Sequence, residues 1–118
     1  VKALQPDITQ KDLDAVMAFY ENDIYRHCST GEIKHEFPFY ALIGQEVIHG
    51  YMDMVALTET ETILIDFKTD RVDGPEILKE LYTDQMKDYI RVLETMFPEQ
   101  KVKAYLYSLA LQSFIEIK

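Results

Sequence analysis

Charged side chains follow directly on an apolar run in residues 63–70, ILIDFKTD. Asp66 and Lys68 lie two residues apart, so on a strand both side chains point to the same face of the sheet. An apolar strand that ends in an acid and a base predicts that this face meets another polar group. The preceding strand supplies a candidate, because Asp53 lies in the apolar-rich residues 47–57.

Residues 47–57 and 62–68 read as two strands joined by the polar sequence TETE. A hairpin with residues 59 and 60 at its tip places Asp53 opposite Asp66. Side chains in such a pair have Cβ atoms about 4.5–5.5 Å apart, so two carboxylates would repel unless one is protonated or a cation lies between them. Carboxylate oxygens suit Mg²⁺ or Mn²⁺. The other pairs in this register are Val55 with Leu64 and Leu57 with Thr62.

Two simpler interpretations stand beside the metal site. Charged residues at the end of a strand often form a solvated rim. A one-residue slip in the hairpin would also place Asp53 and Asp66 on opposite faces of the sheet.

A second candidate feature is an amide on an apolar helix face. A second helix is predicted to start within residues 73–76 and to run to about residue 96. Its apolar stripe includes Gln85 near the middle, and a buried amide needs hydrogen-bond partners. Gln85 and Tyr89 could project toward the carboxylates and contact a phosphate or base of a substrate. The alternative is that Gln85 lies at the helix edge and points to solvent. The stripe comprises Leu78, Leu81, Tyr82, Gln85, Tyr89 and Leu93.

The elements that must position these groups are predicted in the order helix, three strands, helix, two strands. A helix over residues 9–28 begins with a capping-box pattern at Thr9 and Asp12. Extended segments follow at 36–43, 47–57 and 62–68, then the second helix, then a hairpin of residues 102–111 and 113–117. This order predicts one mixed α/β domain over residues 1–118. In the first helix, apolar residues recur at helical spacing at Leu13, Val16, Met17, Tyr20 and Ile24.

Composition limits the class of protein. Hydrophobic residues make up 47% of 118 residues, enough for a core, and the sequence has no apolar run near the ~20 residues of a membrane helix and no signal-peptide pattern. The single cysteine, Cys28, excludes a disulfide or a cysteine metal cluster within this chain and fits a reducing, cytoplasmic setting.

The charge balance is acidic, with 12 Lys and Arg against 21 Asp and Glu. This balance argues against a surface that holds nucleic acid unaided, because nonspecific affinity comes mostly from Lys and Arg. Nucleic acid remains possible as a substrate, since bound divalent cations can reverse the local sign of charge or a partner can supply the basic track.

Five short motifs in order resemble the RecB-like branch of the PD-(D/E)XK nucleases. GYMDMV at residues 50–55 is similar to the G-x-x-D strand of that family, ILIDFKTD to its D-x-K strand, and YTDQMKDY at 82–89 to its Q-x-x-x-Y helix. HEFPF at 35–39 is similar to an upstream E-x-P-F segment, and LYS at 106–108 to the final strand. The resemblance covers about two-thirds of the chain and is greatest to the C-terminal nuclease domain of AddA (RexA) helicase–nuclease subunits. It implies a restriction-endonuclease-like core with a mixed central sheet flanked by helices.

The resemblance also implies roles for individual residues. Asp53 and Asp66 would be metal ligands for Mg²⁺ or Mn²⁺, together with the backbone carbonyl of Phe67. Lys68 would orient the attacking water and stabilise developing phosphoryl charge. Glu36 would support the metal shell, and the substrate-side residues would be Gln85 and Tyr89.

This sequence departs from the family pattern at one point. The family has a metal-binding histidine on an earlier helix, and His27, His35 and His49 do not match its segment. We therefore expect this chain to be a C-terminal fragment whose domain lacks its N-terminal part. His49 shares a strand face with Asp53 and could approach the site, although an exposed or otherwise satisfied histidine is the simpler expectation.

The function implied is a metal-dependent DNA exonuclease domain of an ATP-dependent helicase–nuclease acting in double-strand-break repair and recombination. Its partners would be single-stranded DNA delivered by the helicase and a second, AddB (RexB)-like subunit, with no membrane. Alternatives are another nuclease of the same superfamily, a catalytically inactive scaffold or DNA-end sensor, and an acidic protein-binding domain. The single cysteine weighs against relatives that carry a four-cysteine iron–sulfur cluster.

Overall fold

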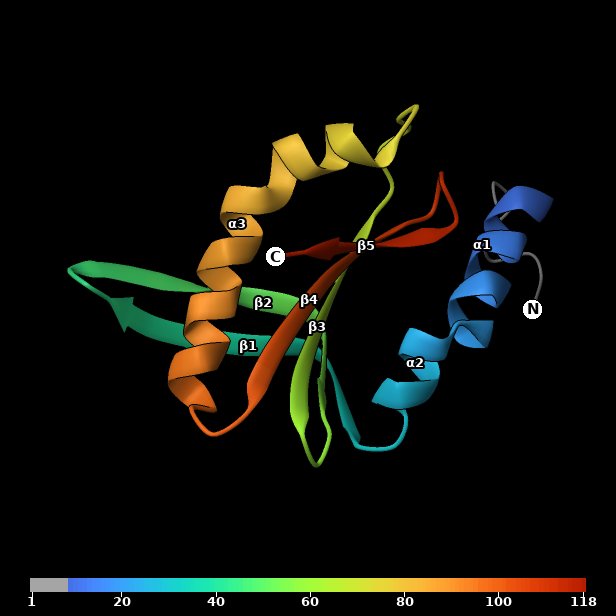
Figure 1. Cartoon of the computed structure of the whole chain (residues 1–118). Helices are drawn as coiled ribbons and strands as arrows, with labels where there is room; N and C mark the ends of the chain where they lie inside the picture. Colours follow the sequence, from blue (N-terminus) through green and yellow to red (C-terminus); the bar gives the residue numbers. More distant parts are fainter. Residues whose placement is uncertain (1–8) are drawn as a thin grey trace.

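The computed structural model describes residues 9–118, in which five strands form one sheet with helices on both of its faces (Figure 1). The strand order is β1-β2-β3-β4-β5. Neighbours are antiparallel except β3 and β4, which are parallel and joined by the crossover helix α3. The mixed α/β fold expected from the element order is confirmed. The elements are α1 (Gln10–Glu21), α2 (Asp23–Cys28), β1 (Glu32–Ile43), β2 (Glu46–Leu57), β3 (Glu61–Lys68), α3 (Pro75–Met96), β4 (Lys101–Ser108) and β5 (Ser113–Ile117).

The first helical region confirms the predicted start but not the predicted length. Thr9 and Asp12 form the capping box. A single helix over residues 9–28 is wrong, because Asn22 has an extended backbone (φ −78°, ψ 146°) and its side chain caps α2 by accepting from the Ile24 N–H. Asn competes well for such a capping position, and here it divides the segment into two short helices.

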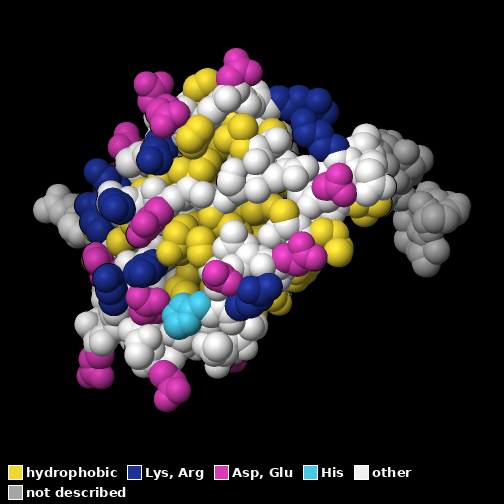
Figure 2. All heavy atoms as spheres, turned by 45° about the vertical axis from the view of Figure 1, so that its right-hand side comes forward, with side chains coloured by type: hydrophobic (Ala, Val, Ile, Leu, Met, Phe, Trp, Pro, Cys, Tyr) yellow, Lys and Arg dark blue, Asp and Glu magenta, His cyan; other side chains and the backbone are white. Residues whose placement is uncertain are grey.

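The apolar stripe predicted for the first helix faces away from the core. Leu13 and Met17 are 49% and 56% exposed, and the residues of α1 that are buried are Ala15 and Phe19. Figure 2 brings the α1 side of the molecule forward and shows hydrophobic side chains exposed between charged ones. The spacing correctly predicted a helix, but the face that packs against the sheet is the neighbouring one, which carries Ala15 and Phe19. None of the described helices is long and apolar enough to cross a membrane.

The predicted hairpin register is confirmed. Val55 lies opposite Leu64 and Leu57 opposite Thr62, and the turn closes through the Thr58 N–H, which donates to the Glu61 carbonyl at 2.9 Å. A one-residue slip is therefore excluded. Side chains of β3 alternate between the two faces: Leu64 packs on the α3 side, and its neighbours Ile63 and Ile65 pack on the α1 and α2 side.

β2 leaves the main sheet partway along its length. It pairs with β3 only over residues 54–57, whereas its pairing with β1 spans residues 46–57 with one interruption, at Glu36 and Asp53. Glu36 has a left-handed backbone (φ 48°). Beyond this interruption the two strands continue as a ribbon that crosses α3 in the view of Figure 1 and contacts it through β1. The side chains change faces there, because Met54 packs toward α1 and α2 while Met52 packs toward α3.

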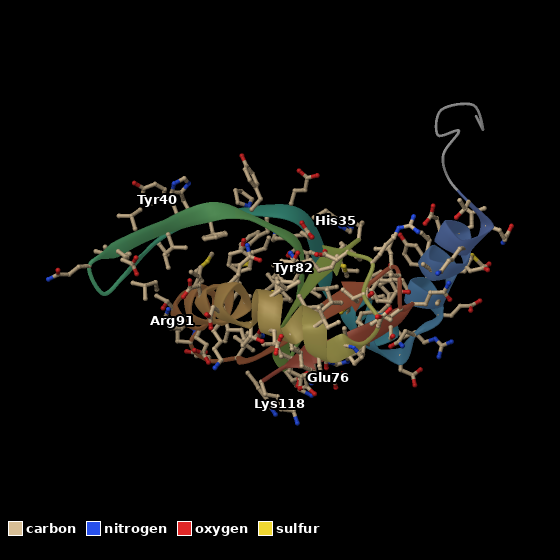
Figure 3. The ribbon with its side chains drawn as sticks, turned by 90° about the horizontal axis from the view of Figure 1, so that it is seen from above. His35, Tyr40, Glu76, Tyr82, Arg91 and Lys118 are labelled. Carbon is tan, nitrogen blue, oxygen red and sulfur yellow. The ribbon has the colours of Figure 1, made fainter. Side chains whose placement is uncertain are left out.

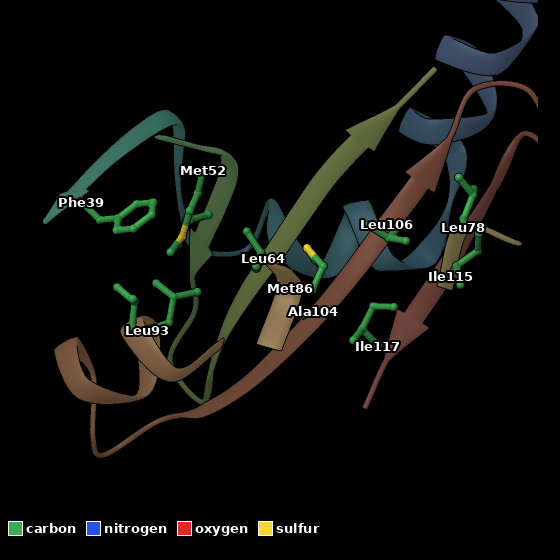
Figure 4. Close-up of a cluster of buried hydrophobic side chains, with 12 residues drawn as sticks. Phe39, Met52, Leu64, Leu78, Met86, Leu93, Ala104, Leu106, Ile115 and Ile117 are labelled. Carbon is green, nitrogen blue, oxygen red and sulfur yellow. The ribbon is translucent and has the colours of Figure 1, made fainter. Parts of the chain in front are cut away.

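The main core lies between α3 and the sheet (Figure 4). Leu78, Met86 and Leu93 of α3 are fully buried against Leu64 of β3 and Leu106 of β4. A second cluster on the opposite face joins α1 and α2 to the sheet and is rich in aromatic rings, with Phe19 contacting the rings of Tyr25, Phe67, Tyr107 and Phe114. Packing on both faces holds the end of β3 in place.

The buried Cys28 thiol makes the folded protein less stable as pH rises into the alkaline range. Burial raises the pKa of this thiol from 9.0 to about 11, a backbone hydrogen bond opposes the rise, and the charge of Glu61 adds to it. Between these values the unfolded chain releases the thiol proton and the folded chain keeps it, so the thiol's contribution to stability falls as pH rises.

We expect the stability advantage of the wild type over Cys28→Ala to shrink by roughly 1 kcal/mol between pH 8 and pH 10. Urea unfolding of both proteins at the two pH values measures this difference, and the shared titration of tyrosines and lysines cancels in it. A difference that stays constant with pH would contradict the expectation.

Candidate active site

Asp53 and Asp66 lie where β2 and β3 separate. The last backbone pair of the two strands is Met54 with Ile65, and the two aspartates are the next residues outward. The Asp53 carboxylate fills part of the gap, because its Oδ2 accepts a hydrogen bond from the Phe67 N–H at 2.9 Å. A side chain thus replaces the backbone partner that a continuing strand would have supplied, and this fixes Asp53 beside β3.

Asp66 is the most unusual group of the site because it is a carboxylate that is only 6% exposed. Lys68 Nζ lies 2.7 Å from its Oδ2 as an ionic contact, and among residues 9–118 no donor reaches this buried oxygen with the geometry of a hydrogen bond. Burial raises the pKa of Asp66 above its ordinary value, Lys68 opposes the rise, and Asp53 adds to it. A second cation at this point would favour the ionised carboxylates.

The donors at this point fit a hard divalent cation. They are the carboxylate oxygens of Asp53 and Asp66, one of which accepts no hydrogen bond from the part of the chain that the structure describes. The Phe67 carbonyl points to the same side of β3 as its N–H, which faces Asp53, because both groups of a strand residue point to one neighbour. Within residues 9–118, no group of three or more His, Cys, Asp and Glu side chains could hold a metal ion. Glu36 is exposed, and the structure does not bring it into a cluster with Asp53 and Asp66.

Lys68 is held between the acid and an aromatic ring. Its side chain is 16% exposed, and Nζ lies 3.9 Å from the centre of the Tyr82 ring in addition to its contact with Asp66. The Tyr82 hydroxyl donates to Asp70 Oδ2 at 2.7 Å, which links α3 to the segment after β3. Neither Tyr82 nor Asp70 was expected at this site from the sequence. The spacing of Tyr82 from Gln85 and Tyr89, at three and seven residues, could have indicated a shared helix face.

Gln85 and Tyr89 occupy the edge of α3 rather than its buried face. Gln85 is exposed, so of the two interpretations the amide at the helix edge is confirmed and the buried amide is excluded. Its Nε2 donates to the Tyr89 hydroxyl at 3.3 Å. Tyr89 packs against the ring of Phe39 and is half-buried. Burial raises its pKa, and the charges of Asp66 and Asp53 add to the rise, so the phenol lies within electrostatic reach of the carboxylates. The fully buried residues of α3 are Leu78, Met86, Val92 and Leu93, while Leu81 is 59% exposed.

Within residues 9–118, none of the three histidines forms a metal-binding group with the two carboxylates. His49 is exposed and its ring stacks on Tyr40, with 5.9 Å between the ring centres, because the change of face near Asp53 turns it outward. Figure 3 shows Tyr40 on the far side of the β1–β2 ribbon from α3, and Tyr82 near the centre of the molecule. His27 contacts Glu61, and His35 is exposed beside an apolar cavity next to α1. The expectation of an exposed His49 is confirmed.

The chain is similar to a segment of much longer proteins. It is 33% identical over 120 residues to an ATP-dependent helicase/nuclease subunit of Lactiplantibacillus plantarum, a match that covers 89% of this chain and 10% of the relative. The protein of the same name from Anoxybacillus flavithermus is 29% identical over 106 residues, with 82% of this chain and 9% of the relative covered. Exonuclease/helicase subunit RexA of Streptococcus pneumoniae is 28% identical over 103 residues, with 80% and 8% covered.

The chain therefore spans about a tenth of the length of these relatives. The resemblance expected from its motifs is confirmed by their names. No protein-family model matches the chain. A solved structure titled "Crystal structure of SSO0001" matches with a TM-score of 0.48 and 18% sequence identity, covering 90% of this chain and 50% of that one.

Proposed function

Because this chain is a relative of a segment of the ATP-dependent helicase/nuclease subunits, we propose that it is the metal-dependent DNA-cleaving part of such a protein. The observation that carries the proposal is one cluster at the end of β3. It combines two adjoining carboxylates, Asp53 and Asp66, with the ammonium group of Lys68 at 2.7 Å from Asp66. Two adjoining carboxylates, one of them buried, with an adjacent ammonium group are an arrangement suited to hydrolysis of phosphodiesters with Mg²⁺.

We further propose that the fold is a restriction-endonuclease-like PD-(D/E)XK core. Two adjacent strands supply the acidic pair, the second of them also supplies the lysine, and the helix that follows supplies Gln85 and Tyr89. This order matches the motifs that the sequence shares with the RecB-like nucleases. The mixed sheet with a parallel β3–β4 pair is compatible with that core.

Asp53 and Asp66 would hold Mg²⁺ or Mn²⁺, with the Phe67 carbonyl as a further ligand. The bound ion would lower the pKa of water and stabilise phosphoryl charge. Lys68 would place its ammonium group beside a non-bridging phosphate oxygen, where positive charge stabilises the transition state. Gln85 and Tyr89, at the edge of α3, would contact the DNA strand and orient it.

The net charge of −9 agrees with DNA that is delivered by another part of the protein. The relatives' names describe helicase subunits, so we propose that a helicase motor feeds a single strand to this site and that cleavage is exonucleolytic. The pathway would be double-strand-break repair and recombination, with an AddB (RexB)-like protein as the second subunit.

Lys68→Ala tests this function in the natural polypeptide that contains this chain. We expect the rate of cleavage of labelled single-stranded DNA in Mg²⁺ to fall about 10²- to 10³-fold, with ATP-driven unwinding unchanged. Lys103→Ala is the matched control, because Lys103 also pairs with a carboxylate, Glu61, but lies near the start of β4, opposite Ile63 and away from the strand end that carries Lys68. We expect this control to cleave at the wild-type rate.

Cleavage at the wild-type rate by Lys68→Ala would contradict the assignment. DNA binding without metal-dependent cleavage by the wild type would instead support the inactive scaffold or DNA-end sensor.

A further inference from the structure

Lys68 needs an external restraint to act at one position. A lysine side chain is a flexible four-carbon stem that ends in a compact ammonium group, so the side chain alone does not fix where that group lies. In this structure, Nζ contacts Asp66 Oδ2 at 2.7 Å on one side and lies 3.9 Å from the centre of the Tyr82 ring on another. The contact with Asp66 lacks the geometry of a hydrogen bond, so it restrains the distance between Nζ and Oδ2 more than the direction from which Nζ approaches.

Tyr82 is itself held in place from two directions. Its backbone belongs to α3, which is anchored by the fully buried Leu78 one turn before and Met86 one turn after. Its hydroxyl donates to Asp70 Oδ2 at 2.7 Å, and Asp70 follows β3 by two residues. The ring is thus fixed between the helix and the strand end that carries Lys68.

The ammonium group of Lys68 lies over the face of the Tyr82 ring and not at its edge. A cation within about 6 Å of a ring centre is attracted to the negative face of the ring, and the attraction strengthens when the cation is shielded from water. Lys68 meets both conditions, since its side chain is 16% exposed and the distance is 3.9 Å.

We propose that Tyr82 is a positioning residue that holds the Lys68 ammonium group beside Asp66, with Asp70 locking the ring. The proposal rests on the proposed nuclease function, since Lys68 is the group that would meet the phosphate. The aromatic face restrains Lys68, and the hydroxyl restrains the ring. The two parts of the Tyr82 side chain therefore have separable roles.

Two substitutions separate these roles. Tyr82→Phe keeps the ring and removes the bond to Asp70, whereas Tyr82→Leu removes the ring. Tyr105→Leu is the control, because Tyr105 is also half-buried but lies on β4 against Phe114. Each variant is first compared with the wild type by far-ultraviolet circular dichroism and thermal melting.

The first readout is the ¹H–¹³C resonance of the Lys68 ε-methylene group in this chain, which the ring current of Tyr82 shifts upfield. We expect the shift to be lost in Tyr82→Leu, largely retained in Tyr82→Phe and unchanged in Tyr105→Leu. An unshifted Lys68 methylene in the wild type, or no nuclear Overhauser effect between it and the Tyr82 ring protons, would overturn the proposal. This wild-type measurement decides the matter even where Tyr82→Leu does not fold.

The second readout is cleavage by the natural polypeptide that contains this chain. We expect Tyr82→Leu to lower kcat about 10- to 100-fold, because a small displacement of a charged group is costly in the transition state. KM for DNA should change less than about threefold, and Tyr82→Phe should recover most of kcat. A loss confined to KM would overturn the positioning role. A wild type that shows the Lys68 shift and no cleavage would support the restraint of Lys68 and refute the nuclease function.

Discussion

Asp66→Asn is expected to abolish DNA cleavage by the natural polypeptide that contains this chain, while the fold becomes no less stable. Asparagine has nearly the same shape as aspartate but has no charge for a divalent cation. Loss of one of two carboxylate ligands should lower cleavage by at least about 10³-fold. Binding of Mn²⁺ to this chain, measured by calorimetry, should be lost in the same variant.

The stability of Asp66→Asn follows from the burial of the carboxyl group. Because the pKa of Asp66 in the folded protein is raised, the unfolded chain loses this proton at lower pH than the folded chain. The contribution of Asp66 to stability is therefore greatest below its unfolded pKa and is lost as pH rises through the folded value. Asparagine has no such loss, so the variant should gain stability relative to wild type as pH rises above 3.8, the ordinary pKa of this carboxyl group.

Asp53→Asn and Asp88→Asn complete the experiment. Asp53→Asn should also lose metal binding, since Asp53 adjoins Asp66, but it keeps an oxygen that can accept from the Phe67 N–H. Asp88 lies on α3 and pairs with Arg91 near the surface, so its replacement should leave Mn²⁺ binding and cleavage unchanged. Retention of metal binding and cleavage by Asp66→Asn would refute the role of this carboxylate as a ligand.

Gly31→Ala is expected to destabilise the fold by about 3 kcal/mol or more. A Cβ atom at this position would lie 2.2 Å from the carbonyl oxygen of Leu57 and 2.8 Å from the Cα of Thr58, and both are backbone atoms. They cannot move away freely, because Glu32, the next residue, pairs with Leu57 at the end of the β1–β2 ladder. Relief of the contact would break this pairing and displace α2 from the sheet.

Gly44→Ala is the matched control for the steric effect. Gly44 has a left-handed backbone (φ 63°), and an added Cβ would meet no atom within 4 Å. Its replacement should cost only about 1–2 kcal/mol, the conformational cost of that backbone for a residue with a side chain. Urea midpoints of the two variants, compared at equal m-value, measure the difference. An equal loss of stability in both would contradict the steric argument at Gly31.

Local signals in the sequence were sufficient for the hairpin that carries the acidic pair. The polar residues between two apolar runs marked the turn, and the turn sets which residues lie opposite each other. The predicted pairing of Val55 with Leu64 followed from this alone and is confirmed. The start of α1 at its capping box and the span of α3 were likewise set by neighbouring residues in the chain.

The sequence was less informative about which face of each helix packs against the sheet. In α1 and α3, several neighbouring faces carry apolar residues, and helical spacing does not say which one meets the sheet. Leu13 and Met17 are exposed while Phe19 is buried, and Gln85 lies at the edge of α3 beside the buried Met86. A rotation of the helix by part of a turn accounts for each of these errors.

The sequence by itself determined the register of β2 and β3, and with it the place of Asp53 next to Asp66, because both depend on a short turn. Only the tertiary structure decided which other groups contact Asp53 and Lys68. The separation of β2 from β3 lets the Asp53 carboxylate bind the Phe67 N–H, and packing of α3 brings the Tyr82 ring over Lys68. These contacts join residues that are 14 apart in each case, across a gap and an interface whose geometry is set by the whole core. Local spacing carries no information on such contacts, since they depend on how layers pack and not on how neighbours in the chain turn.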